Sequence, residues 1–329
     1  MSIPPKIVYT VKKGWKWQWL QLMNGLAPAD KNGNFQRVPS QKNNAHVPDE
    51  KDLENRERKD LPLLIIGRSC PWAHRTWLIY ELRGLRDSLN LCFAKADKDG
   101  GRWLIEPEYI GCKSLLEIYQ LCGTSPTFRA TVPALIDPMP NNKYNPILLG
   151  NESAQLLEVL NQWPTKKNAP DLYPTNLKKE IDYWSTILQF DINDGVYKCG
   201  FARNQSAYNF SSNNLFKALS KVETCLSAKG PWLCGKDLTL ADIKLFPTLI
   251  RWEVVYSTLF KCTKEPLWIF PNIWEWRQKF LELPNISRTC NSFHWTEDYF
   301  GALFPLNPSN IIPNVPELKK IVFSPLQKF

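Results

Sequence analysis

What this sequence lacks excludes several classes of protein. No uncharged apolar run approaches the roughly 18 residues that a membrane-spanning helix needs, and the longest apolar stretch, residues 61–67, fits one buried strand. No two of the nine cysteines have CxxC spacing, and the three histidines lie far apart. We therefore expect no spanning helix, no dithiol redox motif and no metal site.

The cysteines also lack the pattern of a disulfide framework. Nine is an odd number, and the residues are scattered over the chain. Free thiols in a reducing compartment explain this pattern better than paired cysteines in a secreted protein. The sequence thus predicts a cytoplasmic location.

There is no block of five or six like charges, although the chain is basic overall. Lys and Arg number 41 against 32 Asp and Glu, which gives a net charge of +9. A basic surplus can indicate nucleic acid, an anionic membrane or small acidic ligands. The sequence has neither an RNA-binding aromatic signature nor zinc-finger spacing, so we expect a solvated basic surface and no nucleic-acid partner.

Residues 14–23 hold three of the fourteen tryptophans. Four apolar residues there fall on one face of a predicted helix, namely Trp15, Trp19, Leu22 and Met23. A helix that lies on a membrane surface has this pattern, and so does an arm packed on the body of the protein. Because only three lysines accompany the tryptophans, the packed arm is the favoured interpretation and membrane contact the alternative.

The order of predicted elements divides the chain into four parts. Residues 1–60 form a polar, loop-rich extension. Residues 61–163 begin with strand, helix, strand, which favours a right-handed crossover and a parallel pair. After a linker, helical periodicity dominates residues 171–304, so an α/β domain is followed by an all-helical one. Residues 305–329, with five prolines, are predicted to be an extended tail on the surface.

A capping motif marks the start of one helix in the second domain. Thr239 and Asp242 have the spacing at which two side chains satisfy the free amides of a helix end. Losing such a cap costs about 0.5–2 kcal/mol. We assign this pair a structural role.

The motif that carries chemistry is Ser-Cys-Pro-Trp-Ala-His-Arg at residues 69–75, between a predicted strand and helix. Unpaired amides and the helix dipole favour an anion at a helix start, so the pKa of the Cys70 thiol should fall. His74 and Arg75, one turn on, either add a cation or make ordinary contacts. The alternative to a nucleophile is a buried structural cysteine.

Cys70 has no second cysteine beside it. A mixed disulfide formed on Cys70 must therefore be resolved by a thiol from outside the chain, and free glutathione is the natural agent.

Several motifs together resemble the glutathionyl-hydroquinone reductases, the Xi class of glutathione transferases. They are CPWAHR at 70–75, TVP at 131–133, NES at 151–153, DLYP at 171–174, NDGVY at 193–197, LADI at 240–243, FPTLIR at 246–251 and FKC at 260–262. They occur in order along most of the chain, and each alone is less specific than the set.

The resemblance implies a glutathione transferase fold, with an N-terminal thioredoxin-like domain followed by a C-terminal helical bundle. It implies glutathione as co-substrate, aromatic quinone-derived conjugates as substrates, and a homodimer. It assigns catalytic roles to Cys70, Tyr197, Tyr256 and Tyr299, and glutathione binding to Trp103, Arg129, Val132, Glu152 and Ser153.

The residues themselves support part of this assignment. Pro133 can hold a cis bond, which leaves the backbone of Val132 free to pair with an extended peptide. Glu152 can pair with an ammonium group, while Ser153 and the amides of a helix end can hold a carboxylate. A simple strand-entry turn and plain N-capping by Asn151 or Ser153 are the structural alternatives.

The implied reaction is the reduction of glutathionyl-hydroquinones through a disulfide between Cys70 and glutathione. Two alternatives remain open. One is an omega-like thiol transferase or dehydroascorbate reductase with the same nucleophile. The other is a glutathione transferase-like binding protein without turnover.

Overall fold

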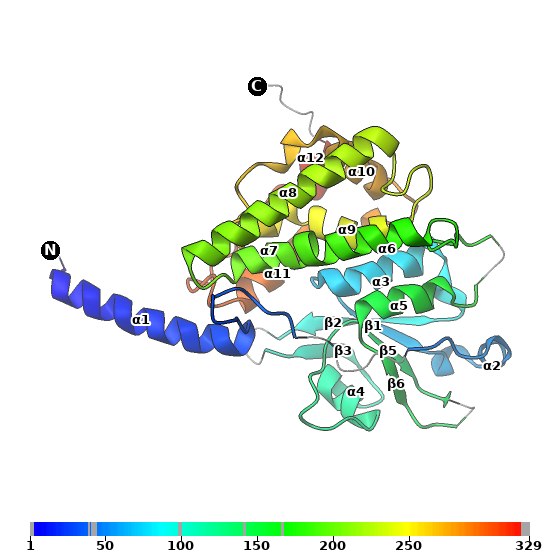
Figure 1. Cartoon of the computed structure of the whole chain (residues 1–329). Helices are drawn as coiled ribbons and strands as arrows, with labels where there is room; N and C mark the ends of the chain where they lie inside the picture. The colour runs from blue at the N-terminus through cyan, green and yellow to red at the C-terminus, as the bar shows by residue number, and fades with distance from the viewer. Residues whose placement is uncertain are drawn as a thin grey trace.

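The computed structural model describes residues 3–38, 40, 45–97, 101–140, 143–165 and 168–323. One mixed sheet lies at the lower right in Figure 1, and most helices lie on one side of it. Helices α3 (Pro71–Leu82) and α5 (Ser153–Asn161) pack on each other between the sheet and the helical part, whereas α4 (Leu115–Leu121) packs on β3 and β4. The predicted fold class, α/β followed by all-α, is confirmed.

The sheet has six strands in the order β4-β3-β2-β1-β5-β6. Their bounds are β1 Leu63–Gly67, β2 Asn90–Ala96, β3 Trp103–Tyr109, β4 Cys112–Ser114, β5 Ala134–Asp137 and β6 Ile147–Gly150. β1 and β2 pair in parallel around α3, which confirms the predicted strand–helix–strand unit. The other pairs are antiparallel.

The sequence analysis did not predict β3, β4 or α4. β3 buries only Ile105 and contains Pro107, so it shows no alternation of apolar and polar residues. Proline is confined to the edges and irregular points of sheets, and the register between β3 and β4 shifts between Leu104 and Tyr109. Pairing with β2 holds this strand in place despite its weak sequence signal.

The described residues from 168 to 323 form helices and connecting turns without a sheet strand, as the periodicity predicted. The longer elements are α6 Lys178–Ile187, η4 Leu188–Asn193, α7 Asp194–Gly200, α8 Gln205–Lys229, α9 Leu240–Leu249, η5 Trp252–Tyr256, α10 Pro271–Leu281 and α11 Ser292–Ala302. η4 and η5 are π-helical. The short elements elsewhere are α2 Glu50–Glu54, η1 Arg58–Asp60, η2 Leu85–Asp87, η6 Leu267–Ile269 and η7 Ser287–Thr289.

The capping box of α9 is confirmed. Asp242 accepts from the backbone amide of Thr239 at 3.1 Å. The same buried carboxylate also accepts from the amide of Leu233 at 3.0 Å and from Trp276 Nε1 at 2.9 Å. This pair therefore ties the start of α9 to a loop and to α10.

The predicted extended tail is wrong for part of its length. Leu318–Phe323 forms helix α12, which packs on α10. Gln278 Nε2 donates to the carbonyl of Val322 at 2.7 Å, and Val322 is fully buried. Apolar burial against α10 thus overrides the proline-rich surroundings, while residues 324–329 of the predicted tail lie outside the described residues.

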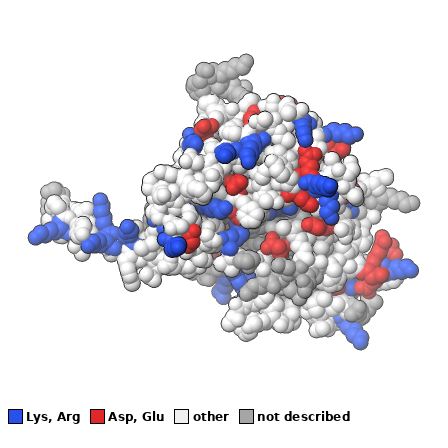
Figure 2. Space-filling view, in the orientation of Figure 1, with Lys and Arg blue, Asp and Glu red and all other residues white. Residues whose placement is uncertain are grey.

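Helix α1 (Pro5–Leu26) projects away from the body of the protein (Figure 1). Met23 is its only buried residue, and Trp19 Nε1 donates to the carbonyl of Pro305 at 2.9 Å. The favoured interpretation, an arm packed on the body, is therefore wrong for most of the helix. Figure 2 shows Lys side chains along α1 and no acidic residue among them. Within the described ranges, no helix combines the length and the apolar character needed to cross a membrane.

Candidate active site

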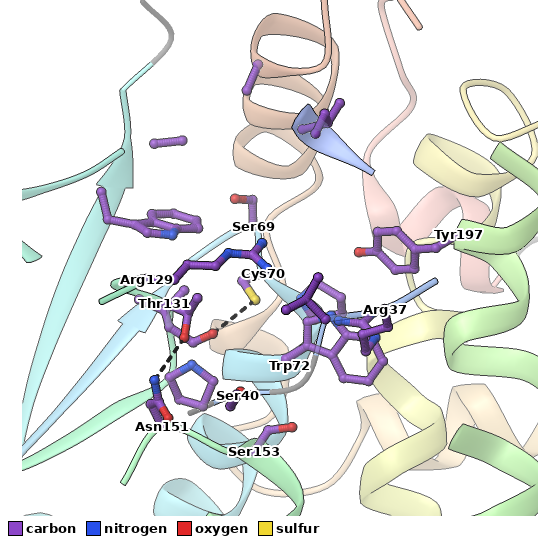
Figure 3. Close-up of a pocket in the computed structure, with 18 of the residues that line it drawn as sticks. Arg37, Ser40, Ser69, Cys70, Trp72, Arg129, Thr131, Asn151, Ser153 and Tyr197 are labelled. Carbon is purple, nitrogen blue, oxygen red and sulfur yellow. Dashed lines mark hydrogen bonds between the residues drawn. The ribbon is translucent and has the colours of Figure 1, made fainter. Parts of the chain in front are cut away.

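A cavity of about 370 Å³ lies where the end of β1 and the start of α3 meet the helical part. Six predicted site residues form what we call the sheet wall, namely Cys70, Trp103, Arg129, Val132, Glu152 and Ser153. Three others form the helical wall, namely Tyr197, Tyr256 and Tyr299. All nine except Tyr256 line the cavity, and Tyr256 hydrogen bonds to Tyr299 from behind. Figure 3 shows Cys70 between Thr131 on the sheet side and Tyr197 on the helical side.

Cys70 is the N-cap residue of α3, directly after the loop that follows β1. Its Sγ–H donates to the carbonyl of Val132 over 3.7 Å. Burial raises the pKa of the Cys70 thiol above its ordinary value. The amides of Ala73 and Trp72 and the charge of Arg251 lower this pKa, but burial outweighs them. The predicted fall in the pKa is therefore wrong, although the helix end acts in the predicted direction.

A buried guanidinium from the helical part holds the loop before α3. Arg251 donates to the carbonyl of Ser69 at 3.2 Å and to that of Arg68 at 3.4 Å. It also donates to His74 Nδ1 at 2.8 Å, and His74 Nε2 lies 2.8 Å from Thr289 Oγ1. Because Nδ1 accepts from a guanidinium, Nε2 must carry the ring proton and donate to Thr289.

The electrostatics of this network fix the charge of His74. Burial, and then the charge of Arg251, push the pKa of His74 well below its ordinary value. The imidazole is therefore neutral and cannot be the cation that the sequence allowed beside the thiol. The sequence placed Arg251 in the motif at residues 246–251, but it did not predict the contact of Arg251 with the loop before α3.

The backbone of Val132 lies beside the sulfur. The Val132–Pro133 bond is cis, as Pro133 made possible. The neighbouring Thr131 is fixed on both sides, since Tyr119 Oη donates to its carbonyl at 2.6 Å and Asn151 Nδ2 donates to its Oγ1 at 3.2 Å. This turn presents a rigid backbone edge to the cavity.

Glu152, and neither Asn151 nor Ser153, caps α5. Its Oε1 accepts from the Ala154 amide at 3.1 Å, and Ser153 Oγ donates to the same oxygen at 3.5 Å. Capping and ligand binding are compatible here, because the carboxylate has a second oxygen and both residues line the cavity. The start of α5 also favours an anion.

Trp103 reaches the cavity by lying over Gly67, the last residue of β1. A Cβ atom at Gly67 would come within 2.6 Å of the indole ring and 3.0 Å of Val132 Cγ2. Only glycine leaves this space open, so Gly67 places Trp103 in the sheet wall.

The helical wall is a chain of three hydroxyl groups. Tyr197 Oη lies 2.5 Å from Tyr299 Oη, which lies 3.3 Å from Tyr256 Oη. The ring of Phe260 packs against all three, with centroid distances between 5.2 and 5.9 Å. A Cβ atom at Gly200 would come within 1.9 Å of that ring, so glycine is required there.

Burial is the largest cause that raises the pKa of each of these three tyrosines. At neutral pH all three hydroxyl groups therefore keep their protons and can donate hydrogen bonds. The sequence placed these residues together only through the family resemblance, and the structure brings them together.

The N-terminal extension also lines the cavity, which the sequence analysis did not predict. The guanidinium of Arg37 lies 3.9 Å from the ring centre of Trp72 and 5.5 Å from that of Tyr197. Arg37 also forms an ion pair with Asp194, whose other oxygen accepts from Gln189 Nε2 at 3.0 Å. No signal in the polar loop around Arg37 indicates this position, because the contact joins residues 157 positions apart.

The chain matches known proteins over most of its length. Residues 205–279 match the family "Glutathione S-transferase, C-terminal domain". The chain is 32% identical to the glutathionyl-hydroquinone reductase PcpF of Sphingobium chlorophenolicum, over 76% of this chain and 81% of PcpF. It is 31% identical to the glutathionyl-hydroquinone reductase YqjG of Escherichia coli, over 77% of this chain and 79% of YqjG.

The chain is also similar to a further relative and to a solved structure. The omega-like glutathione S-transferase 2 of Schizosaccharomyces pombe is 30% identical, over 87% of this chain and 94% of the relative. The glutathione-bound structure of YqjG superposes with a TM-score of 0.72 at 28% identity, and covers 89% of this chain and 98% of YqjG.

Proposed function

This chain belongs to the glutathionyl-hydroquinone reductases, the Xi class of glutathione transferases, and from that premise we propose that it removes glutathione from glutathionyl-hydroquinones through a Cys70–glutathione disulfide. The observation that carries the proposal is the position of Cys70 at the start of α3, inside a cavity whose opposite wall holds three protonated tyrosines. A nucleophile and a proton donor thus face the same space.

The reaction has two steps. In the first, the Cys70 thiolate attacks the glutathione sulfur of the conjugate, so a sulfur–sulfur bond forms and the carbon–sulfur bond breaks. The ring carbon leaves with the electron pair of that bond and takes a proton from Tyr197. In the second, a free glutathione thiolate attacks the mixed disulfide and releases oxidised glutathione and the Cys70 thiolate. The ring carbon gains two electrons, one from the thioether sulfur of the conjugate and one from the thiol sulfur of free glutathione, and the proton that this thiol releases returns to Tyr197.

Because its pKa is raised, the Cys70 thiol is mostly protonated in the free protein, and the reaction needs a step that forms the thiolate. We propose that binding of the glutathione conjugate lowers this pKa so that Cys70 releases its proton to solvent, because the peptide N–H of an extended ligand would take over the carbonyl of Val132. The Sγ–H would then lose its acceptor, while the amides of Ala73 and Trp72 still favour the anion. The charge of Arg251 acts in the same direction.

The sheet wall is proposed to bind glutathione by its two ends. The second oxygen of Glu152 pairs with the γ-glutamyl ammonium, and Ser153 with the start of α5 holds the adjacent carboxylate. Trp103 flanks the peptide, and Arg129, which also lines the cavity, binds the carboxylate at the other end of glutathione.

The acceptor ring is proposed to lie against the aromatic side of the cavity, which includes Phe35, Trp72 and Phe201. Flat rings stack well on such surfaces. We also propose a homodimer in the reducing cytoplasm, where the nine free cysteines would stay reduced.

The test is turnover of glutathionyl-menadiol by wild type and by Cys70→Ala. The wild type is expected to show ping-pong kinetics and, by mass spectrometry after one turnover without free glutathione, one glutathione bound at Cys70. Full activity in Cys70→Ala contradicts the mechanism. Cys262→Ala serves as the matched control, because that thiol is buried outside the cavity.

The omega-like relative motivates a second assay. If dehydroascorbate is reduced much faster than glutathionyl-menadiol, the omega-like thiol transferase is the better description. If wild type forms no glutathione adduct with either substrate, the chain is a binding protein.

A further inference from the structure

The structure leaves the apolar stripe of helix α1 largely exposed. The stripe consists of Ile7, Val11, Trp15, Leu22 and Leu26, which repeat at helical spacing on one face. Their side chains are exposed by between 40% for Leu26 and 62% for Val11. Scattered single apolar residues on a surface are ordinary, but a continuous stripe along a projecting helix indicates a partner.

We propose that helix α1 docks with this stripe on the surface of a membrane that contains anionic lipid. The charges on the helix select this partner. Lys6, Lys12, Lys13 and Lys16 all lie on α1, and no Asp or Glu lies between residues 5 and 26. Figure 2 shows this basic arm apart from the acidic residues of the body. Lysines on the polar side of such a helix attract anionic headgroups.

A second copy of α1 fits this surface less well. Two such helices packed stripe to stripe would carry their lysines on the outer faces of the pair, with no acidic residue on either helix to pair with them, whereas anionic headgroups would pair with them. Tryptophan, in contrast, is enriched at the boundary between headgroups and acyl chains. Since α1 is too polar to span a bilayer, it would lie in the plane of the surface.

Contacts at the end of α1 connect the helix to the active-site cavity. Trp15 packs edge-on against Phe304 with ring centroids 6.5 Å apart, and Trp19 is hydrogen bonded to Pro305. Leu26, at the end of the stripe, and Leu303, next to Phe304, both line the cavity of about 370 Å³. A docked helix would therefore hold the cavity beside the lipid surface.

This placement has a consequence for the substrate, which rests on the proposed function. Quinone-derived conjugates with long apolar ring substituents partition into membranes and would reach the cavity directly from the surface. The lipid binding itself does not depend on the reaction.

The experiment is flotation of the full chain with vesicles of phosphatidylcholine alone and with phosphatidylglycerol added. Wild type should float with the anionic vesicles and remain in solution with the neutral ones. Replacing Lys12, Lys13 and Lys16 together by Gln should weaken binding on the order of a hundredfold at low salt. Trp15→Ala with Leu22→Ser should weaken it about tenfold or more, because apolar area is lost.

The matched control is Trp17→Ala. Trp17 is exposed by 64% and lies outside the stripe, although it borders the same surface hollow as Trp15 and Leu22, so its loss should weaken binding less than the change in the stripe. Equal losses for Trp15 and Trp17 variants, or wild-type binding to neutral vesicles as strong as to anionic ones, would overturn the proposal. So would absence of binding combined with self-association that Trp15→Ala abolishes in analytical ultracentrifugation.

Turnover of glutathionyl-menadiol without vesicles separates this proposal from the proposed function. All three α1 variants should keep wild-type turnover, since none of the substituted residues lies in the sheet wall or the helical wall. An inactive wild type that still floats refutes the reaction alone, and an active wild type that does not float refutes the membrane site alone.

Discussion

The two walls of the cavity differ in the chemical groups that they present. The sheet wall combines backbone groups, which are the carbonyl of Val132 and the amides at the starts of α3 and α5, with the Cys70 sulfur and the side chains proposed to bind glutathione. The helical wall acts through side-chain hydroxyls, which Phe260 and burial hold in place. Replacing a side chain leaves the backbone N–H and C=O of that residue in place, whereas replacing a tyrosine by phenylalanine removes its hydroxyl.

This difference predicts where substitutions act. A change in the helical wall should remove a chemical step and leave the fold intact. A change around the sheet wall should mainly alter glutathione binding, geometry or stability, with the Cys70 sulfur as the exception. Arg251 is the link between the two, because it comes from the helical part and holds the loop before α3.

The largest effect is expected for Tyr197→Phe. If Tyr197 donates the proton to the leaving ring carbon, kcat for glutathionyl-menadiol should fall by roughly 10²–10⁴. Reduction of a preformed Cys70–glutathione disulfide should keep its rate, since that step needs no proton on carbon. Stopped-flow measurement of the two half-reactions checks both statements.

Tyr208→Phe is the control for this variant. Tyr208 Oη also donates a hydrogen bond, to the carbonyl of Lys261 at 2.7 Å, but it does not line the cavity. Turnover should therefore stay at the wild-type level. A similar loss in both half-reactions of Tyr197→Phe would show that the hydroxyl positions the wall rather than donating a proton.

The next largest effect is expected for Arg251→Met, which breaks the link between the walls. The substitution leaves the carbonyl of Ser69 and the Nδ1 atom of His74 without their donor in a buried site. The free energy of unfolding should fall by about 3 kcal/mol. Urea denaturation measures this, and Lys229→Met, which removes a largely exposed ion pair with Glu180, should lose less than about 1 kcal/mol.

A smaller effect is expected for Arg37→Met, which tests whether the extension belongs to the helical wall. The change removes the cation above Trp72 and leaves the buried Asp194 without its ion pair. We expect the KM for glutathionyl-menadiol to rise about tenfold with kcat nearly unchanged, because packing of the cavity wall is lost at a cost of about 1–2 kcal/mol. Arg102→Met, which breaks an exposed pair with Asp97, should leave KM unchanged.

The two walls also differ in how far the sequence could predict them. Cys70 and Glu152 each come after a strand and cap a helix, and Val132 lies just before β5, so local signals place their backbone groups at element ends. The tyrosines of the helical wall lie up to 102 positions apart and look like ordinary residues of amphipathic helices. Only the family resemblance assigned them to one site.

Three features of the structure that the sequence did not predict have physical causes. The contacts of Arg37 and Arg251 depend on tertiary packing, which no local pattern encodes. Burial of the sulfur, which reverses the predicted pKa shift of Cys70, is likewise a tertiary property. In α1, the helical spacing was correct, but the sequence did not reveal that the body covers only its last turns.

The smallest effect is expected for the pKa of the Cys70 thiol, which measures how the sheet wall stabilises the thiolate. Because burial raises the pKa of this thiol, alkylation of the free protein by iodoacetamide should be slow at pH 7 and increase until the pH exceeds the ordinary cysteine pKa. Binding of S-methylglutathione should lower the pKa, measured by thiolate absorbance as the difference from Cys70→Ser, because the ligand takes over the carbonyl of Val132. A pKa below the ordinary value in the free protein would instead mean that the helix end alone ionises the sulfur, and an unchanged value on binding would contradict the role proposed for the ligand.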